Sequence, residues 1–386
     1  MSSEGLNFTF TDEQEAFRSS IAQLVDDKIA PRAEEIDEAD EYPWDIDELL
    51  VRSGFAGVSY PEEHGGAGGG AVELCILVEE LSRWSAAVSL IPAVNKLSAI
   101  PVLLAGSKAQ RDELCAGITE GRHRMSYCLT EPGSGSDAAA MRTRATRRGG
   151  GWSITGSKRF ITNAGASDLY TCFAVTDPDA AKARRISAFL VSGEAEGFSL
   201  GRKEDKMGIR GSPTREVILE DCSVDDDAVI GEVGQGLELA FRTLDFSRPT
   251  IAAQALGIAQ GAFNAATAYC AERQQFGQPL KSFQGLQFMF ADMAMKIETA
   301  RLAVYRAAHA IDTADERVTY WAAIAKCYAS DVAMAVTTDC VQAMGGYGYI
   351  KEYPVERLMR DAKITQIYEG TNQIQRVVIA RHIFGK

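Results

Sequence analysis

The sequence predicts an α+β protein with three domains, in the order helical domain, β domain and helical bundle. The chain has 386 residues, 46% of them hydrophobic and 24% charged, which suits a globular protein of two or three domains. Apolar residues recur at helical intervals at both ends of the chain, whereas the middle carries short β-branched and aromatic runs between turn residues. These changes of pattern place the domains at residues 1–122, 123–232 and 233–386.

The first domain is expected to be mainly helical. Thr11 and Gln14 form a capping-box pattern, and the apolar residues that follow lie on one helical face until Pro31, which is expected to end or kink the helix. Further helices are expected at about 45–52, 71–90 and 95–104.

The middle domain is expected to be built from strands. Its β-rich runs are 152–163, 169–176, 186–191 and 215–224. No helix-length pattern interrupts them, so the sequence does not describe a βαβ array. A small antiparallel barrel or sandwich is the predicted arrangement.

The last domain is expected to be an antiparallel helical bundle. Apolar positions step mostly by three, four or seven residues along two segments, roughly 286–311 and 321–336. Pro249 falls inside the first helix of this domain and is expected to kink it or delay its start.

Charge and composition exclude several classes of function. The chain carries 40 Lys and Arg against 53 Asp and Glu, a formal net charge of −13. So acidic a surface repels phosphate backbones and anionic lipid, so we expect no nucleic acid and no membrane partner. Glu79 and Glu80 also interrupt the most apolar early segment before it reaches the roughly 18 residues of a membrane span.

Cysteine and histidine usage predicts a cytoplasmic protein without a metal site. Eight cysteines are scattered from Cys75 to Cys340 without a CxxC pair, as in proteins that keep reduced thiols. The first ten residues lack the basic and apolar regions of a signal peptide. The four histidines stand far apart, without the spacing of metal ligands.

Three widespread motifs are not supported. The glycine-rich segment 64–70 lacks the Lys-Ser/Thr of a P-loop, and we interpret it as a flexible connection. The Gly-x-Gly pairs at 234–236 and 346–348 lack the third glycine of a dinucleotide fingerprint. No GxSxG nucleophile elbow occurs in the chain.

Two segments allow either a structural or a functional interpretation. Residues 127–140 predict a strand, a turn at Pro132-Gly133 and a loop of small residues, which either makes local turns or approaches a planar, phosphorylated ligand. Glu369 stands at a break between two helical runs, where an acidic residue is either simply solvated or functional.

Taken together, five motifs in a fixed order resemble the FAD-dependent acyl-CoA dehydrogenase family, of the bacterial short- or medium-chain type. They are CLTEPGSGSD (128–137), RFITN (159–163), ERQQFG (272–277), QAMGGYGY (342–349) and IYEGTNQIQR (367–376). The resemblance covers essentially the whole chain. It implies an N-terminal helical domain, a middle antiparallel β barrel or sandwich and a C-terminal four-helix bundle, usually in a homotetramer that is a dimer of dimers. The family binds FAD without a Rossmann fingerprint, which agrees with its absence here.

The resemblance implies α,β-dehydrogenation of an acyl-CoA thioester to the trans-2-enoyl-CoA. Glu369 matches the family's catalytic base, and burial in a water-poor site would raise its pKa toward the operating pH. The β-hydrogen would leave as hydride to flavin N5, and the electrons would pass to electron-transferring flavoprotein. Some members carry the base on the bundle helix before an Arg-Pro pair, but Ser247 occupies that position here and serine cannot serve.

The resemblance also implies contacts with FAD. Positions that match the flavin segments are Tyr127, Leu129, Thr130, Ser136, Phe160, Thr162, Thr371 and Gln373. Phe160 replaces the Trp of many members, so it can shield a flavin face but cannot donate an indole hydrogen bond. Arg273, Phe276 and Gln284 match positions that reach a neighbouring subunit's cofactor, and Gln342 and Gly346 match the adenosine-diphosphate site.

The substrate contacts implied by the resemblance are Ser136, Asp245, Arg248 and Gly370. Gly370 leaves room for the thioester, and Arg248 is expected to face CoA, to brace the base loop, or to make a helix cap or salt bridge. The acyl pocket is expected to be lined by the start of the bundle and by the helix that carries Ser89, Ile91, Pro92, Val94 and Leu97. Dicarboxylate-specific members use an arginine at the position of Ser89, and Lys96 lies a turn or more away, so a short or medium monocarboxylic chain is favoured.

Other functions on the same fold stay open. One is a flavin oxidase or monooxygenase, against which the intact YEGT motif argues. Another is a dehydrogenase that acts on a carrier-protein-bound or branched acyl thioester. A third is a non-catalytic protein that binds acyl thioesters.

Overall fold

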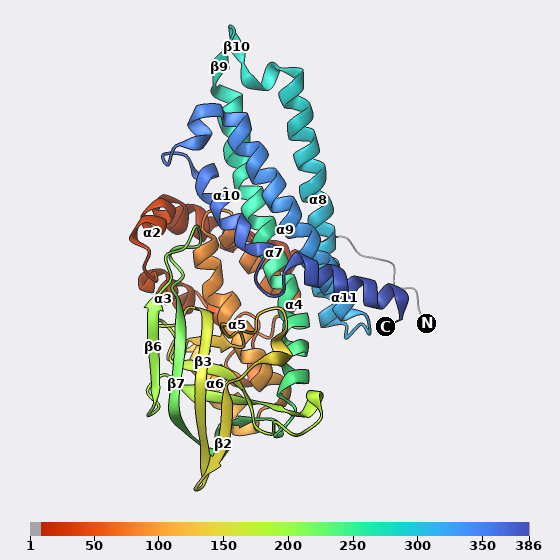
Figure 1. Cartoon of the computed structure of the whole chain (residues 1–386). Helices are drawn as coiled ribbons and strands as arrows, with labels where there is room; N and C mark the ends of the chain where they lie inside the picture. The colour runs from red at the N-terminus through yellow and green to blue at the C-terminus, as the bar shows by residue number, and fades with distance from the viewer. Residues whose placement is uncertain (1–8, 386) are drawn as a thin grey trace.

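The computed structural model describes residues 9–385, so most of the segment that lacks a signal-peptide pattern lies outside the described residues. Two helical regions and one sheet confirm the predicted fold class. The long helices α8 and α9 stand at one end and the sheet stands at the other, while α7 runs from the bundle to the sheet (Figure 1). The N-terminal helices pack against both the bundle and the sheet.

The N-terminal region is helical, as predicted. Its helices are α1 (Asp12–Leu24), α2 (Ala33–Ala39), α3 (Trp44–Arg52), α4 (Ala71–Ser82), α5 (Ala86–Ala105) and α6 (Lys108–Thr119). The capping box forms, because Thr11 Oγ1 accepts from the Gln14 amide and Gln14 Oε1 accepts from the Thr11 amide. The first helix loses its α geometry after Leu24, and Pro31 lies in a 3₁₀ turn before α2 begins.

Some boundaries in this region differ from the prediction. The helix expected at 71–90 is divided into α4 and α5, because the Ser85 hydroxyl accepts a hydrogen bond from the Val88 amide and starts a new helix. α5 then includes the separate helix expected at 95–104. The prediction also missed α6, although Ser107 begins a capping box there.

The middle region is one eight-stranded sheet. Its strands are β1 (Met125–Cys128), β2 (Arg144–Arg148), β3 (Gly151–Thr162), β4 (Leu169–Val175), β5 (Ile186–Ser192), β6 (Phe198–Lys203), β7 (Thr214–Asp225) and β8 (Val229–Ile230). The order across it is β6-β7-β3-β2-β4-β5-β8, with β1 beside β4. β1 and β4 are parallel, so the sheet is mixed rather than wholly antiparallel. A parallel pair needs a long crossover, and here the crossover carries the loop 129–143, which lines the site described below.

The C-terminal region is a helical bundle, as predicted. Its helices are α7 (Gly236–Glu272), α8 (Gln284–Asp312), α9 (Val318–Met344), α10 (Pro354–Thr365) and α11 (Asn372–Phe384), and the short strands β9 (Gln274–Gln275) and β10 (Gln278–Pro279) follow α7. The predicted stripe on α8 is buried at Met293, Ile297 and Val304. Pro249 lies well inside α7, so it does not delay the start of that helix.

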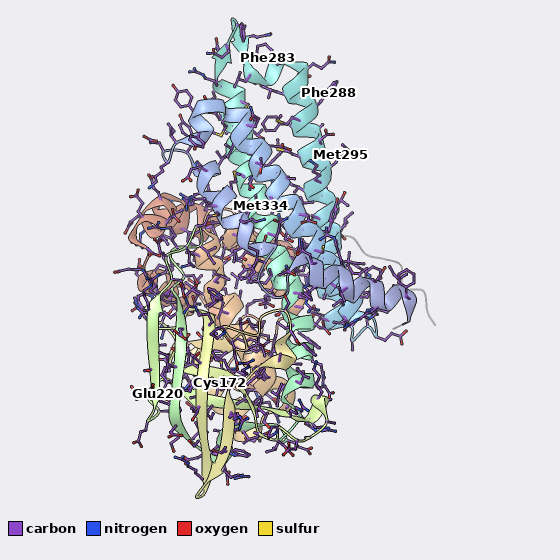
Figure 2. All side chains as sticks on the ribbon, viewed as in Figure 1. Cys172, Glu220, Phe283, Phe288, Met295 and Met334 are labelled. Carbon is purple, nitrogen blue, oxygen red and sulfur yellow. The ribbon has the colours of Figure 1, made fainter. Side chains whose placement is uncertain are left out.

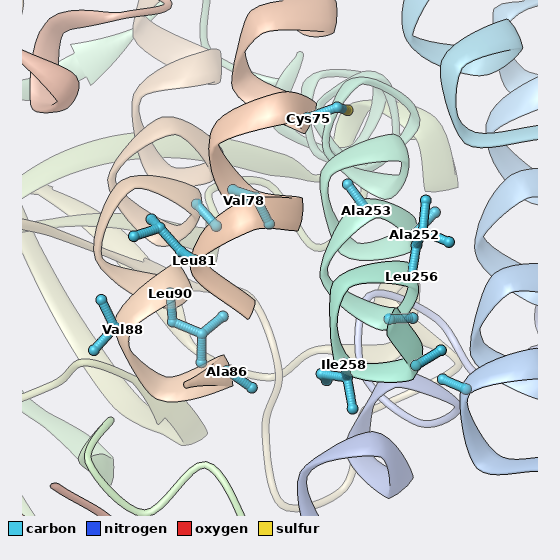
Figure 3. Packing of buried hydrophobic residues seen from close by; sticks show 14 of the residues in the cluster. Cys75, Val78, Leu81, Ala86, Val88, Leu90, Ala252, Ala253, Leu256 and Ile258 are labelled. Atoms are coloured by element: carbon cyan, nitrogen blue, oxygen red, sulfur yellow. The ribbon is translucent and has the colours of Figure 1, made fainter. Parts of the chain in front are cut away.

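Close packing of α7 on the N-terminal helices positions the site. A Cβ atom on Gly261 would lie 1.8 Å from the carbonyl oxygen of Arg83, so this approach requires glycine. Alongside it, Leu256 and Ile258 of α7 join Leu81 of α4 in one buried cluster (Figure 3). α7 also packs against α5, and both helices contribute residues to the wall of one pocket.

The described residues give one candidate membrane span and no candidate metal site. Within residues 9–385, α5 is the one helix long and apolar enough to cross a membrane, but 78% of its most apolar stretch is buried inside the fold, as in a core helix. In the same part of the chain no group of three or more His, Cys, Asp or Glu residues is placed to hold a metal ion. All eight cysteines are free and buried.

Candidate active site

One pocket brings together residues from seven separate segments. They are α5, the end of β1, the loop 129–143, the end of β3, α7, the connection between α10 and α11, and the first turn of α11. Of the residues predicted for cofactor, substrate or catalysis, its walls include Tyr127, Leu129, Thr130, Ser136, Phe160, Thr162, Arg248, Glu369 and Gly370. The sequence motifs that lie far apart in the chain therefore converge on one concave site, as expected for a small-molecule pocket.

Glu369 occupies a strained turn in that site. The connection between α10 and α11, residues 366–371, is called the Glu369 loop below. Glu369 has φ +55° and Gly370 has φ +91°, so both lie in the left-handed region. That conformation is uncommon for a residue with a side chain, and such residues concentrate at functional sites. Thr371 ends the loop as the N-cap of α11, where its hydroxyl accepts from the Ile374 amide.

The Glu369 carboxylate has a hydroxyl partner and no ion-pair partner within the described residues. Ser247 Oγ donates a hydrogen bond to Glu369 Oε2. Desolvation by burial raises the pKa of Glu369 above its ordinary value, although the Ser247 hydrogen bond and the charges of Arg248 and Lys326 oppose that rise. A carboxylate in this environment is suited to take up a proton.

Arg248 both braces the Glu369 loop and forms a salt bridge. Its guanidinium is buried, contacts the Asp245 carboxylate at 2.5 Å, and donates from Nε to the Glu369 carbonyl oxygen at 3.4 Å. Asp245 accepts from the Thr319 hydroxyl at 2.6 Å and is absent from the pocket lining. Asp245 therefore holds Arg248 in place, and its contact with the substrate stays a prediction.

A buried ion pair holds the loop 129–143. Lys158 is fully buried on β3, and its Nζ lies 2.8 Å from a carboxylate oxygen of Glu131. The same carboxylate accepts the amides of Arg142 and Thr143 at 2.6 and 3.0 Å. Sequence reasoning missed this pair, although both residues lie in or beside the motifs quoted above. The pair ties both ends of the loop to β3 beside Phe160, a residue that is 62% exposed.

The wall formed by α5 differs in part from the prediction. Val94 and Leu97 line the pocket as expected, together with Leu90 and Ala93, whereas Ser89, Ile91 and Pro92 do not. The helical period places these two sets on different faces of α5. The Ser89 hydroxyl instead accepts from Gln254 Nε2 of α7 at 3.0 Å. The start of the bundle lines the pocket as expected, through Phe241, Leu244 and Ile251 of α7. Tyr368 and Ile374 also line it, and the sequence did not identify these two.

The remaining predicted cofactor residues lie outside this pocket. Arg273, Gln342 and Gly346 line a second hollow near the far end of the bundle, where Arg273 lies over the Tyr347 ring. Phe276 is 94% exposed in the turn between β9 and β10, and Gln284 is exposed at the start of α8. Gln373 is exposed on the first turn of α11 and lines neither hollow. Within one chain, most of the residues predicted to contact the cofactor therefore lie in three places: the first pocket, the second hollow and the exposed surface.

Comparison with known proteins agrees with this geometry. Three family models match in succession: acyl-CoA dehydrogenase N-terminal domain (residues 11–122), middle domain (126–222) and C-terminal domain (234–384). The chain is 51% identical to the probable acyl-CoA dehydrogenase FadE25 of Mycobacterium tuberculosis over 374 residues, which cover 97% of this chain and 96% of the relative.

Solved structures give the same result. A butyryl-CoA dehydrogenase from Megasphaera elsdenii superposes with a TM-score of 0.95 and 42% identity, over 98% of this chain and 100% of that one. A chain from a study of the electron transferring flavoprotein of Acidaminococcus fermentans gives a TM-score of 0.96 and 44% identity, over 99% and 100%. The chain belongs to the acyl-CoA dehydrogenase family, and it is an oxidoreductase of that family.

Proposed function

We propose that this protein oxidises an acyl-CoA thioester to the trans-2-enoyl-CoA, with Glu369 as the base. Glu369 would take the α-proton, the β-hydrogen would leave with its electron pair as hydride, and the C–C bond would become a double bond. The observation that carries this proposal is the position of Glu369. It lines the pocket together with the loop 129–143 and the apolar residues of α5 and α7.

The residues present suit FAD as the hydride acceptor. The pocket offers hydroxyl groups at Tyr127, Thr130, Ser136 and Thr162 beside the exposed ring of Phe160. Hydroxyls and a flat aromatic face are the groups expected to hold a planar, polar ring system. When bound there, FAD would supply two-electron redox chemistry, and we propose electron-transferring flavoprotein as the next acceptor of those electrons.

The pocket chemistry supports a monocarboxylic acyl chain of short or medium length. Leu90, Val94, Leu97, Leu244 and Ile251 give it an apolar wall. Apart from Glu369, its described lining contains one charged residue, Arg248, and that residue is already paired with Asp245. A second carboxylate on the substrate would therefore find no free cation there, and burying it unpaired would be unfavourable.

A hydrogen-bonded pair, Tyr368 and Gln254, limits the depth of the acyl pocket on one side. Tyr368 lines the pocket and its hydroxyl donates to Gln254 Oε1, while Gln254 Nε2 donates to Ala86 O at 3.1 Å and to Ser89 Oγ. Gln254 is fully buried, and these bonds use both ends of its amide. The pair therefore resists displacement by a longer chain, because displacement would leave buried polar groups unsatisfied.

This arrangement predicts the outcome of an anaerobic titration with straight and branched acyl-CoAs from C4 to C16, followed at the flavin band near 450 nm. Short straight chains are expected to bleach the flavin most effectively. Gln254→Ala should raise the preference for C8 over C4 about tenfold, since it makes room for roughly two methylenes at about 0.8 kcal/mol each. Gln260→Ala, on the partly exposed continuation of α7, serves as the control.

Other outcomes of that titration would overturn the proposal. Bound flavin that no acyl-CoA bleaches would exclude this substrate class and direct attention to carrier-protein thioesters. Steady oxygen consumption with peroxide would indicate an oxidase. If Gln254→Ala kept the wild-type preference for chain length, the Tyr368–Gln254 pair would not be what limits the length of the acyl chain.

We also propose a homotetramer, a dimer of dimers, in the cytoplasm. The eight free cysteines suit a reducing compartment. Phe288, Met295 and Leu302 recur every seven residues on α8 and are 61%, 62% and 52% exposed. Figure 2 shows Phe288 and Met295 along α8. An exposed apolar stripe of this kind is typical of an interface between helices.

Sedimentation velocity is expected to give a mass of four chains for the flavin-loaded protein. Phe288→Asp should shift the distribution to smaller species, because it places a carboxylate in the proposed interface. Val233→Asp, at an exposed position before α7, should not. A monomeric wild type would contradict the proposed assembly.

A further inference from the structure

Lys326 of α9 contacts the Glu369 loop and is not among the residues that line the pocket. Its side chain is fully buried, and its Nζ donates to the Gly370 carbonyl oxygen at 2.7 Å and to Asn372 Oδ1 at 2.9 Å. Both acceptors lie within three residues of Glu369. No sequence motif discussed above includes Lys326.

This lysine is expensive to bury, and no carboxylate neutralises it directly. Within residues 9–385 it has no ion pair within 4.0 Å. Burial lowers its pKa to about 8, although the charge of Glu369 favours the ammonium. An unpaired buried charge is unfavourable for stability, so packing alone does not account for a lysine here.

Asn372, the first residue of α11, belongs to the same hydrogen-bond network as Lys326. Its Oδ1 accepts from Lys326 and from Ser330 Oγ at 3.1 Å, and its Nδ2 donates to Asp331 Oδ1 at 2.8 Å. From the other direction, Gln375 Nε2 donates to the carbonyl oxygens of Glu369 and Gly370 at 3.2 and 3.0 Å. The peptide groups on both sides of Gly370 are therefore fixed, which holds Glu369 in its left-handed conformation.

We propose that Lys326 is a positioning residue for the reaction. It fixes the Gly370 carbonyl so that the Glu369 carboxyl faces the pocket, and its ammonium group favours the ionised form of that carboxyl. The proposal rests on the proposed function, in which Glu369 is the base.

The other charges around Glu369 are already paired. On α7, Arg248 contacts Asp245 at 2.5 Å. On α9, Asp331 contacts Arg376 of α11 at 2.7 Å. Arg248 and Lys326 both favour the ionised form of Glu369. Arg248 shares its charge with Asp245, whereas Lys326 has no ion pair within 4.0 Å among the described residues, so its ammonium acts on Glu369 without a competing carboxylate in contact.

The test compares Lys326→Met and Lys326→Gln with wild type, as flavin-loaded protein. Lys326→Met removes both charge and donor, and it is expected to lower kcat about 10- to 100-fold near neutral pH with less than about a threefold change in KM, as for a misplaced base. The acid limb of the pH–rate profile should move to higher pH, because Glu369 loses a neighbouring cation. The difference in rate between the variant and wild type should be seen below about pH 8, because wild-type Lys326 is charged there.

A readout independent of turnover measures the carboxyl itself. The infrared carboxyl band that is absent in Glu369→Gln identifies Glu369, and its titration should move to higher pH in Lys326→Met. Lys326→Gln keeps an N–H donor without the charge. It should show the same shift of titration with a smaller loss of kcat, and it provides the test if the Met variant does not fold.

Lys96→Met is the matched control. Lys96 is a half-buried lysine whose pKa is likewise lowered to about 8 by burial, and its Nζ donates to the Ser59 carbonyl oxygen rather than to the Glu369 loop. Its variant should keep the wild-type pH profile. Folded Lys326 variants with an unchanged acid limb and an unchanged infrared titration would overturn the inference. If Glu369→Gln also retained turnover, the proposed base itself would be wrong.

Discussion

Glu369→Gln is expected to lower kcat by about 10²- to 10⁴-fold, the contribution typical of a positioned general base. Gln has nearly the same shape as Glu, and its Oε1 can still accept the hydrogen bond from Ser247. The backbone contacts of the Glu369 loop do not involve the carboxyl, so the pocket should keep its shape. The variant should therefore bind flavin and acyl-CoA as the wild type does while losing the ability to take the α-proton.

The measurement is stopped-flow flavin bleaching with the best acyl-CoA of the titration panel. Flavin content and thioester binding are measured on the same preparation. Glu352→Gln, an exposed position before α10, is the control for the loss of one carboxylate from the bundle. Near wild-type bleaching in Glu369→Gln would exclude Glu369 from proton abstraction.

Lys158→Met is expected to lower the free energy of unfolding by about 3–5 kcal/mol, because it leaves the Glu131 carboxylate buried without its cation. Burial by itself would raise the pKa of Glu131, but Lys158 and the hydrogen bonds from Thr143 and Arg142 outweigh it and hold that pKa below its ordinary value. The carboxylate orders the loop 129–143, so the variant should also retain less flavin.

Unfolding curves and the flavin-to-protein ratio measure this effect. The double variant Lys158→Met/Glu131→Gln should recover part of the loss, because Gln is neutral and still accepts from the loop amides. Lys182→Met, at an exposed position 4.0 Å from Asp137, is the control.

The effect also has a defined pH dependence. The folded-state pKa of Glu131 is lowered, so ionised Glu131 contributes stability above its unfolded pKa of about 4.5, and this contribution is lost as the pH falls through the folded pKa. The gap between wild type and Lys158→Met should therefore narrow in acid. An equal gap at pH 7 and pH 3, or wild-type stability in the variant, would contradict the assignment.

Local patterns in the sequence determined much of the fold. The capping box at Thr11, the end of the first helix near Pro31 and the apolar stripe on α8 all follow from interactions within a few residues. The order of five motifs was also enough to indicate the family. Each of these signals lies in one short segment, so it can be recognised without knowing what packs against it.

The tertiary structure decided which residues surround Glu369. Ser247 stands 122 residues away in the chain and Lys326 stands 44 residues from Gly370, yet both contact the Glu369 loop. The Tyr368–Gln254 pair and the parallel β1–β4 pair likewise join distant segments. These contacts depend on how whole helices and strands pack, where close approaches such as that of Gly261 to Arg83 fix distances that no local pattern encodes. The sequence therefore determined the elements and the family, while packing decided the charges and hydrogen bonds that act on the carboxylate.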